Sequence, residues 1–500
     1  MKRGALSLLA ITCLLAAFPA LPAYAEEKAD AILQPVVHDP VVTRHKGRFN
    51  GQALAYSAIV EPIDVADAEG KTGARVVSFS YVADAAKTQT PRPVMFLFNG
   101  GPISPSYLVH LGGFGPRRVL FPDDVKADPA SFRLIDNPDS PLDHADLVFV
   151  DPASTGFSRV APGKRPEEYF SIDSDAQQVA AFIQAWLKRH GRSGSPVFIL
   201  GESYGTNRAA AVAAQLTALP DPVQVSGVVL FGQALNIIEY AQRPANIISY
   251  SVSLPTLASI AWYHGKVDRT GQDFDSFVEA ARVYARTTYL PALFRGANLP
   301  QEERAAVAAQ LERFSGIAAS LYLQNDLKIT KERFRIELLK NQGLLIGRND
   351  ARYAEPVTER GGAPDPSRII PEATERLFRQ YIRDELQVDW AEPYVTTSPV
   401  KGLEGWGWGG SGTTPFSDWP YQASLSPLFE KNPRFRVMVA NGYYDTQTTI
   451  GAAEYLVTQS GWPSDRTDLR YYQGGHMAYS VDASARQFGA DLRTFIAAAR

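Results

Sequence analysis

Apolar and polar side chains alternate between residues 40 and 85 of this chain, as in ALAYSAIVEPIDV and ARVVSFSYVAD. The two alternating stretches lie on either side of the turn-prone DAEGKTG. Because successive side chains of a strand point to opposite faces, this alternation is typical of strands that bury one face. We therefore expect an antiparallel hairpin or meander in this part of the chain.

Farther along the chain, short continuous apolar runs predict buried strands. These runs are RPVMFLFNGG, ADLVFVDPASTGFSR, PVFIL, QVSGVVLFGQ, FRVMVANG and LRYYQGG. Residues 173–190 have apolar positions at helical spacing, with an acidic start and a basic end, and the alanine-rich segment 207–216 also favours a helix. Strands separated by helices indicate an α/β fold, with a mostly parallel sheet and helices on both faces.

Between residues 233 and 400 the strand-like runs stop and helical patterns replace them. One of these is PQEERAAVAAQLERF, in which Pro300 suits the first turn of a helix. We interpret this region as a helical cap inserted into the sheet domain. The predicted core therefore consists of residues 26–232 and 401–500, with the cap of residues 233–400 between its two parts.

The first residues have the features of a secretory signal peptide. Lys2 and Arg3 precede an apolar stretch over residues 5–18, and Ala-Tyr-Ala at 23–25 is a small-residue cleavage site. We expect residues 1–25 to be removed and the mature chain to be exported, to the periplasm or the exterior. An uncleaved anchor is the alternative, but the apolar run is short for a membrane span. No later stretch is long and apolar enough to cross a bilayer.

Composition narrows the function classes. The chain has 500 residues, 45% of them hydrophobic and 21% charged, which is ordinary for a soluble enzyme with a large core. A net charge of −3 gives no electrostatic case for binding nucleic acid or an anionic membrane. The one cysteine, Cys13, lies in the signal peptide, which excludes thiol catalysis, cysteine metal sites and disulfides from the mature protein. The oligomeric state is left open.

The stretch GESYG, which follows the apolar run PVFIL, predicts a nucleophilic serine. Gly201 and Gly205 lack a Cβ, so a strand end and a helix start can approach closely and Ser203 can adopt a strained backbone conformation. The Ser203 hydroxyl would then be exposed above the sheet, near a helix N-terminus that favours negative charge. A chance match to this short pattern is the alternative, so partners are required.

Two residues that follow predicted strands are suitable partners for Ser203. His476 lies in the glycine turn YYQGGHMAY and would be the general base, and Asp445 in ANGYYDTQTT would orient its imidazole. Either residue could instead be structural, as a packed histidine and an N-cap aspartate. The chain order Ser203, Asp445, His476 is the one expected of α/β-hydrolases. We expect backbone N–H groups of Tyr204 and of the glycine turn NGGP at 99–102 to hold the oxyanion.

Several motifs together carry a family resemblance. In chain order they are FNGGPISPS, GGFGPRR, DPASTGFSR, GESYG, NGYYDTQTTIGAAEYL and GGHM. With them the sequence resembles a bacterial member of the serine carboxypeptidases over roughly residues 75–480. The resemblance implies an exopeptidase that removes C-terminal residues from peptides by acyl-enzyme chemistry, without a cofactor or a metal ion. It also implies that Ser203, Asp445 and His476 are the triad and that Gly101 and Tyr204 supply the oxyanion-hole N–H groups.

The resemblance further implies how a peptide's terminal carboxylate is bound. Asn99, Gly100 and Glu202 would hydrogen-bond it, and Met477 would lie beside the leaving residue. Glu202 must be neutral to donate such a bond, which would favour turnover at acid pH. The alternative is an ordinary ionised glutamate at a helix N-terminus.

Three positions depart from the family pattern. Ile103 replaces the last glycine of NGGPG, Leu97 replaces a tryptophan, and Gly113 replaces the acidic residue that partners the elbow glutamate. Without that second carboxyl, Glu202 has less reason to stay neutral. Arg117 and Arg118 could offer a compensating cation or could be solvated loop residues.

We therefore predict a secreted serine-type carboxypeptidase whose partner is a peptide with a free C-terminus. An esterase or acyltransferase that uses the same triad is the alternative, and a catalytically silent binding protein is a third class. The cap is expected to set substrate choice. Five aromatic residues either line its pocket or form the cap's own core: Tyr250, Trp262, Tyr263, Trp406 and Trp408.

Overall fold

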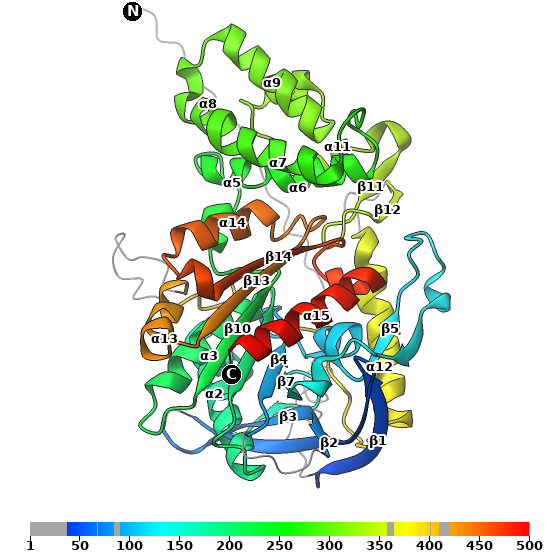
Figure 1. Ribbon diagram of the computed structural model, residues 1–500, viewed down its shortest axis with the longest axis vertical. Coiled ribbons are helices and arrows are strands. Elements are labelled where there is room, and N and C mark those ends of the chain that lie inside the picture. The colour runs from blue at the N-terminus through cyan, green and yellow to red at the C-terminus, as the bar shows by residue number, and fades with distance from the viewer. Residues whose placement is uncertain are drawn as a thin grey trace, which may run out of the picture.

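A ten-stranded sheet in the order β1-β2-β3-β7-β4-β9-β10-β13-β14, with β8 paired to β3, runs through the lower part of the molecule (Figure 1). The computed structural model describes residues 38–67, 69–84, 91–357, 365–400, 402–409 and 421–499. The predicted signal peptide lies outside these residues. The sheet strands are β1 Val41–Phe49, β2 Gln52–Ala66, β3 Thr72–Ala83, β4 Val94–Phe98, β7 Asp146–Asp151, β8 Arg159–Val160, β9 Val197–Glu202, β10 Val225–Phe231, β13 Arg436–Gly442 and β14 Thr467–Tyr472.

The first three strands form the antiparallel meander that the alternating pattern predicts. From β7 to β14 neighbouring strands are parallel, so their carboxyl ends meet at one edge of the sheet. Residues 233–400 also hold a short ribbon, β11 Leu344–Ile346 and β12 Ala354–Pro356, which the sequence pattern missed because three-residue strands have no readable period. A further ribbon joins β5 Arg117–Leu120 to β6 Arg133–Asp136.

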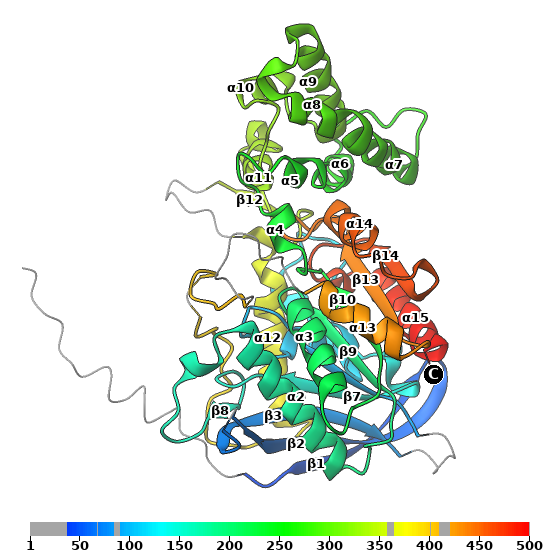
Figure 2. The ribbon, with the colours of Figure 1, turned by 90° about the vertical axis from the view of Figure 1, so that its left-hand side faces the viewer.

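Helices cover both faces of the sheet, as Figures 1 and 2 show. The helices are α2 Ile172–Arg189, α3 Gly205–Ala218, α4 Ile237–Tyr240, α5 Ile247–Ser251, α6 Leu254–Tyr263, α7 Phe274–Tyr284, α8 Leu290–Arg295, α9 Gln301–Ser315, α10 Ala319–Gln324, α11 Lys331–Glu337, α12 Ile369–Asp384, α13 Ser426–Lys431, α14 Ile450–Gln459 and α15 Asp482–Ala498. One face packs against α2, α3, α13 and α14, and the other against α12 and α15. Both faces of the central strands are therefore buried, which explains why β4 and β10 are largely apolar, whereas the edge strand β14 is only half-buried and carries charged residues.

Strand β4 illustrates the two buried faces. Met95 and Leu97 belong to the apolar cluster on the α15 side, whereas Phe96 and Phe98 belong to the cluster on the α3 side. The predicted α/β architecture, a mostly parallel sheet between helical layers, is confirmed.

The upper helices have an apolar core of their own. Buried side chains from α6, α7, α9 and α11 form this core, among them Leu257, Ala281, Leu311 and Phe334. These helices stand above the carboxyl-end edge of the sheet (Figure 2). Helix α12 also falls within residues 233–400, but it packs on the sheet, where Phe378 lies 5.4 Å from the Phe79 ring. The limits of a separate cap at 233 and 400 stay a prediction.

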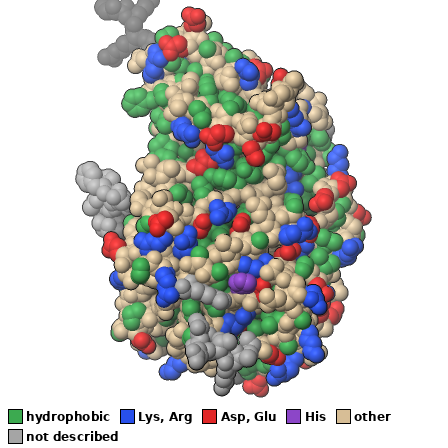
Figure 3. Space-filling view, in the orientation of Figure 1, with side chains coloured by type: hydrophobic (Ala, Val, Ile, Leu, Met, Phe, Trp, Pro, Cys, Tyr) green, Lys and Arg blue, Asp and Glu red, His purple; other side chains and the backbone are tan. Residues whose placement is uncertain are grey.

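The described surface is mixed in charge. On the face in Figure 3, basic and acidic side chains are interspersed, in keeping with the formal net charge of −3. Of the helices that the described residues form, none combines the length and the apolar character that a bilayer span needs.

Candidate active site

The GESYG turn joins β9 to α3 with the backbone strain that its glycines predict. Ser203 has a φ of 60°, in the left-handed region that residues with a Cβ rarely occupy. A Cβ on Gly201 would clash with the carbonyl oxygen of Gly205, so the two glycines allow the strand end and the helix start to touch. The Ser203 N–H donates to the Phe231 carbonyl at 2.9 Å, which fixes the turn against the end of β10.

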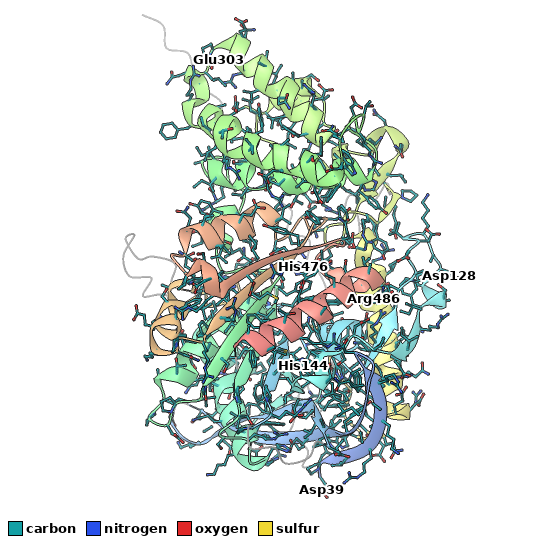
Figure 4. All side chains as sticks on the ribbon, in the orientation of Figure 1. Asp39, Asp128, His144, Glu303, His476 and Arg486 are labelled. Carbon is teal, nitrogen blue, oxygen red and sulfur yellow. The ribbon has the colours of Figure 1, made fainter. Side chains whose placement is uncertain are left out.

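His476 and Asp445 come together beside this turn. Nδ1 of His476 lies 2.6 Å from Oδ2 of Asp445, and both side chains are buried. The other carboxylate oxygen accepts the backbone N–H of Gln447 at 2.7 Å, and the Thr448 hydroxyl donates to Oδ2. Because Asp445 occupies Nδ1, the tautomer assigned to His476 leaves Nε2 able to accept a proton. Figure 4 shows His476 between the sheet and the upper helices.

The pKa of His476 is set by opposing effects. Burial alone lowers the pKa, but the Asp445 carboxylate and, to a smaller degree, Glu202 raise it to about 9. An imidazolium is therefore well stabilised at this position.

Ser203 lies next to this pair without a hydrogen bond to it. Among the described residues, no hydrogen bond joins the Ser203 hydroxyl to His476. The two are linked through the end of β10: Ser203 N–H bonds to Phe231, and a Cβ on the next residue, Gly232, would lie 3.0 Å from Cε1 of His476. All three predicted triad residues therefore lie at the same edge of the sheet.

The glycine turn after β4 packs directly on the serine turn. A Cβ on Gly100 would lie 2.6 Å from the Tyr204 backbone nitrogen, and Gly101 has a φ of 117°. Gly101, Ser203 and Tyr204 line one cavity. In the part of the chain that the structure describes, no backbone carbonyl accepts from the N–H of Gly101 or Tyr204.

A buried ion pair holds this turn, and sequence reasoning missed it. Arg208 pairs with Asp175 at 2.7 Å, and its guanidinium also donates to the Asn99 and Pro102 carbonyls at 2.7 and 3.1 Å. Asp175 also accepts the Tyr204 hydroxyl at 3.0 Å. One signal could have revealed it, since Arg208 is the only charged residue of an otherwise uncharged helix, α3. A cation in such a helix needs a buried partner.

Glu202 is buried, and each of its carboxylate oxygens accepts a hydrogen bond. The Asn99 side-chain amide donates to Oε1 at 3.0 Å, and the Tyr479 hydroxyl donates to Oε2 at 2.6 Å. The carbonyl oxygen of the Asn99 amide accepts the Val109 N–H at 3.1 Å. Burial raises the pKa of Glu202 to about 7, although His476 and these two donors favour the carboxylate.

The sequence comparison agrees with this arrangement. Residues 71–237, which contain both the serine turn and the glycine turn, match the model of the serine carboxypeptidase family. This segment is similar to the serine carboxypeptidase family, and the match spans about a third of the chain. No curated protein matches the sequence significantly.

The fold of this chain is similar to that of known structures. One is a prohormone-processing carboxypeptidase of Saccharomyces cerevisiae, Kex1(delta)p, at a TM-score of 0.52 and 14% identity, covering 88% of this chain and 91% of that chain. Another is the proline iminopeptidase of Mycobacterium smegmatis, at a TM-score of 0.35 and 13% identity, covering 88% and 98%. At 14% identity the likeness to the yeast carboxypeptidase is one of fold, which is that of α/β-hydrolases.

Gly113, which departs from the family pattern, leaves space for the Tyr479 ring because it has no side chain. A Cβ on Gly113 would lie 3.0 Å from Cγ of the Tyr479 ring, and one on Gly112 would lie 2.9 Å from Cε2. An aromatic phenol thus bonds to Glu202 where the family pattern leads one to expect a second carboxyl. Sequence reasoning missed Tyr479, although a tyrosine three residues after His476 beside a missing acidic residue was a usable signal.

Other predicted residues lie away from the cavity. Met477 is buried in the apolar cluster on the α15 side of the sheet. Arg117 pairs with Asp136 and Glu385, and Arg118 pairs with Asp482, so both arginines have carboxylate partners of their own.

A cavity of about 380 Å³ opens at Ser203, beneath the upper helices. The lining residues are Gly101, Ser203, Tyr204, Asn207, Ala234, Ile237, Tyr240, Gln242, Lys331, Glu332, Arg348, Leu403, Trp408, Thr446, Gln447 and Thr448. Of the five aromatic residues considered for its wall, Trp408 is the one that lines it. Trp406 packs on the Tyr204 ring at 5.1 Å, and Tyr250 and Trp262 pack in the upper helical core. No cluster of metal-ligating side chains occurs within the described ranges.

Proposed function

We propose that the protein is an exported carboxypeptidase that releases C-terminal residues from peptides through an acyl-enzyme on Ser203. The observation that carries this proposal is the 2.6 Å pair of His476 and Asp445 beside the strained turn of Ser203. A left-handed serine at a strand-to-helix turn, next to a histidine with a carboxylate partner, is the arrangement that acyl transfer requires.

In the first half of the reaction, the Ser203 hydroxyl turns toward Nε2 of His476 and attacks the last peptide carbonyl. His476 takes the hydroxyl proton, and the negative charge of Asp445 stabilises the imidazolium that forms. The carbonyl oxygen becomes an oxyanion, which the N–H groups of Gly101 and Tyr204 hold. The imidazolium then protonates the leaving amine, and the C-terminal amino acid departs.

In the second half, a water molecule attacks the acyl-enzyme. His476 accepts a proton from the water as the new carbon–oxygen bond forms, and it returns that proton to the Ser203 oxygen as the ester bond breaks. The products are the shortened peptide and the free enzyme.

The peptide's terminal carboxylate is the feature that defines an exopeptidase substrate. We propose that Asn99, Gly100 and Glu202 bind it and that Met477 lies beside the leaving residue. Because Glu202 is bonded to Asn99 and Tyr479 in the free protein, the substrate must take over at least one of these bonds. A neutral Glu202 can donate a hydrogen bond to the carboxylate, whereas an ionised Glu202 repels it.

The deciding experiment compares blocked dipeptides that end in a free acid with the same dipeptides ending in an amide, across pH. We expect release of the terminal amino acid from the free acids and little release from the amides. Ser203→Ala should abolish turnover and labelling by a fluorophosphonate, and Ser226→Ala, a buried serine on β10, is the matched control. Equal turnover of acids and amides contradicts the exopeptidase assignment.

An esterase or acyltransferase is the second candidate, and the Tyr479 hydrogen bond favours it. That bond stabilises the Glu202 carboxylate, which is unfavourable for binding an anionic C-terminus. Rapid cleavage of blocked amino-acid esters, combined with no preference for free-acid peptides, would support this second function.

The proposal that the protein is exported rests on the signal-peptide features of residues 1–25. Fractionation of cells that produce the full chain should give a shortened protein outside the cytoplasm. A full-length product retained inside the cell contradicts it.

A further inference from the structure

Lys331 is a lysine of the upper helices that lines the cavity of Ser203. It is the first residue of α11, and its ammonium group donates to the Gln447 carbonyl at 2.8 Å. The same nitrogen lies 5.2 Å from the centre of the Tyr240 ring, as in a cation–π contact. Among the described residues, no carboxylate forms an ion pair with Lys331.

The acidic groups around Lys331 have other partners. Glu332 also lines the cavity, but its carboxylate binds Arg335 at 2.6 Å and Arg348 at 3.1 Å. The Asp445 carboxylate is bonded to His476. Glu332 is therefore shared by two arginines, and the ammonium of Lys331 has N–H donors left for a ligand.

The Lys331 ammonium is charged at neutral pH. Burial lowers the pKa of Lys331 to about 8, and Asp445 acts in the opposite direction. A partly buried cation with unused donors attracts an anion more strongly than a solvated surface lysine does.

The position of the cavity decides which part of a substrate Lys331 meets. The cavity is lined by Ser203 and the proposed oxyanion residues Gly101 and Tyr204, whereas Asn99 and Glu202 do not line it. A peptide with its last carbonyl at Ser203 and its terminal carboxylate at Glu202 must direct its acyl side into the cavity.

We propose that Lys331 determines specificity by binding the side-chain carboxylate of a glutamate or aspartate on the acyl side of the scissile bond. This inference rests on the proposed function, because it takes the terminal carboxylate to lie on the Glu202 side. It assigns the enzyme to peptides with an acidic residue in the second-last position.

The test measures kcat/KM at pH 7 for blocked dipeptides Xaa-Phe in which Xaa is Glu, Gln or Lys. We expect Glu to exceed Gln by about tenfold, the size of one charge-assisted hydrogen bond. Lys331→Met should bring the Glu/Gln ratio close to one, and Lys331→Glu should favour Lys over Glu. Lys331→Gln retains a donor for the Gln447 carbonyl and should also bring the Glu/Gln ratio close to one. This second variant keeps the test possible if the methionine variant does not fold.

Lys328→Met is the matched control, because Lys328 lies on the same segment, donates to the Pro244 carbonyl and does not line the cavity. It should keep the wild-type ratio. Equal rates for Glu and Gln in the wild type, or an unchanged ratio in Lys331→Met, overturn the inference. A preference for acidic residues in the leaving position also overturns it.

Failure of the proposed function gives a different result. In that case none of the dipeptides loses phenylalanine, whereas methyl esters of blocked Glu and Gln are still cleaved through Ser203. The Glu/Gln ratio of those esters then reports on Lys331 independently of carboxylate recognition.

Discussion

The sheet edge and the upper helices both border the cavity, but they hold their side chains in different ways. Asp445 and Glu202, at the sheet edge, are buried and each accepts at least two hydrogen bonds. The wall opposite comes from α4 and α11, helices of four and seven residues, and from the loop of Leu403, which is 49% exposed.

The difference separates two tasks. Groups that must keep a fixed geometry lie where several strands end together and neighbouring backbones can bond them. Groups that select a substrate lie on short elements that can change without disturbing the sheet. Chemistry should therefore be sensitive to single atoms at the sheet edge, and selectivity should respond in smaller steps to changes in the upper wall.

The largest effect is expected from Asp445→Asn. An amide at this position keeps the shape but removes the charge, and its NH₂ favours the wrong tautomer of His476. We expect kcat to fall roughly 10³- to 10⁴-fold, with little change in KM.

Asp136→Asn is the control, because Asp136 is exposed and pairs with Arg117 away from the cavity. It should leave kcat within about twofold of the wild type, in line with the small effects of surface substitutions. A loss of less than about tenfold in Asp445→Asn would mean that the sheet edge tolerates substitution as the upper wall does.

A smaller effect is expected from Glu202 and its phenol partner. Because burial raises the pKa of Glu202 to about 7, the neutral form is present below that pH and is lost above it. If the neutral form binds the terminal carboxylate, kcat/KM for free-acid peptides relative to that for esters without a terminal carboxylate should fall about fivefold from pH 7 to pH 8 and about tenfold for each further pH unit. Taking this ratio removes the effect of His476, which acts equally on both substrates. Tyr479→Phe removes a donor that favours the anion, so the Glu202 pKa should rise and the fall should move to higher pH.

Tyr455→Phe, a partly exposed tyrosine on α14, is the control for loss of a phenol. Esters without a terminal carboxylate supply a second check. Their turnover should rise with pH, because His476 must lose its proton and its pKa is raised. If the pH at which the relative kcat/KM of free-acid peptides falls is the same in Tyr479→Phe as in the wild type, Glu202 does not govern binding of the terminal carboxylate.

The smallest effect is expected in the upper wall. Leu403→Ala removes apolar surface from the cavity, so kcat/KM for dipeptides with a large apolar acyl residue should fall about fivefold, or roughly 1 kcal/mol. Alanine as the acyl residue should be cleaved almost as before. Phe294→Ala, which is 83% exposed on α8, is the control. A hundredfold loss with every substrate would place Leu403 with the sheet-edge residues instead.

The sequence was informative where structure depends on local pattern. Continuous apolar runs predicted the parallel strands, and the residues that follow those runs include Ser203, Asp445 and His476. Parallel strands bring such positions to one edge, so their proximity follows from topology. The glycines of the serine turn were also predictable, since only a missing Cβ allows that approach.

Contacts between distant segments escaped the sequence pattern. Tyr479 reaches Glu202 because Gly112 and Gly113 leave space for its ring. Lys331 reaches the cavity because the upper helices fold over the sheet edge, and no periodicity encodes that placement. The pairing of Arg208 with Asp175 likewise joins two helices that the pattern predicts separately.

The left-handed backbone of Ser203 lowers the stability of the fold, although the proposed activity requires a serine at this position. For a residue with a side chain this conformation lowers the free energy of unfolding by about 1–2 kcal/mol, a penalty that is absent for glycine. Even after the extra chain entropy of glycine is counted, Ser203→Gly should stabilise the fold by up to about 1 kcal/mol. The most thermostable version of this turn would thus be an inert one, and screens that reward only heat resistance would select against the hydroxyl.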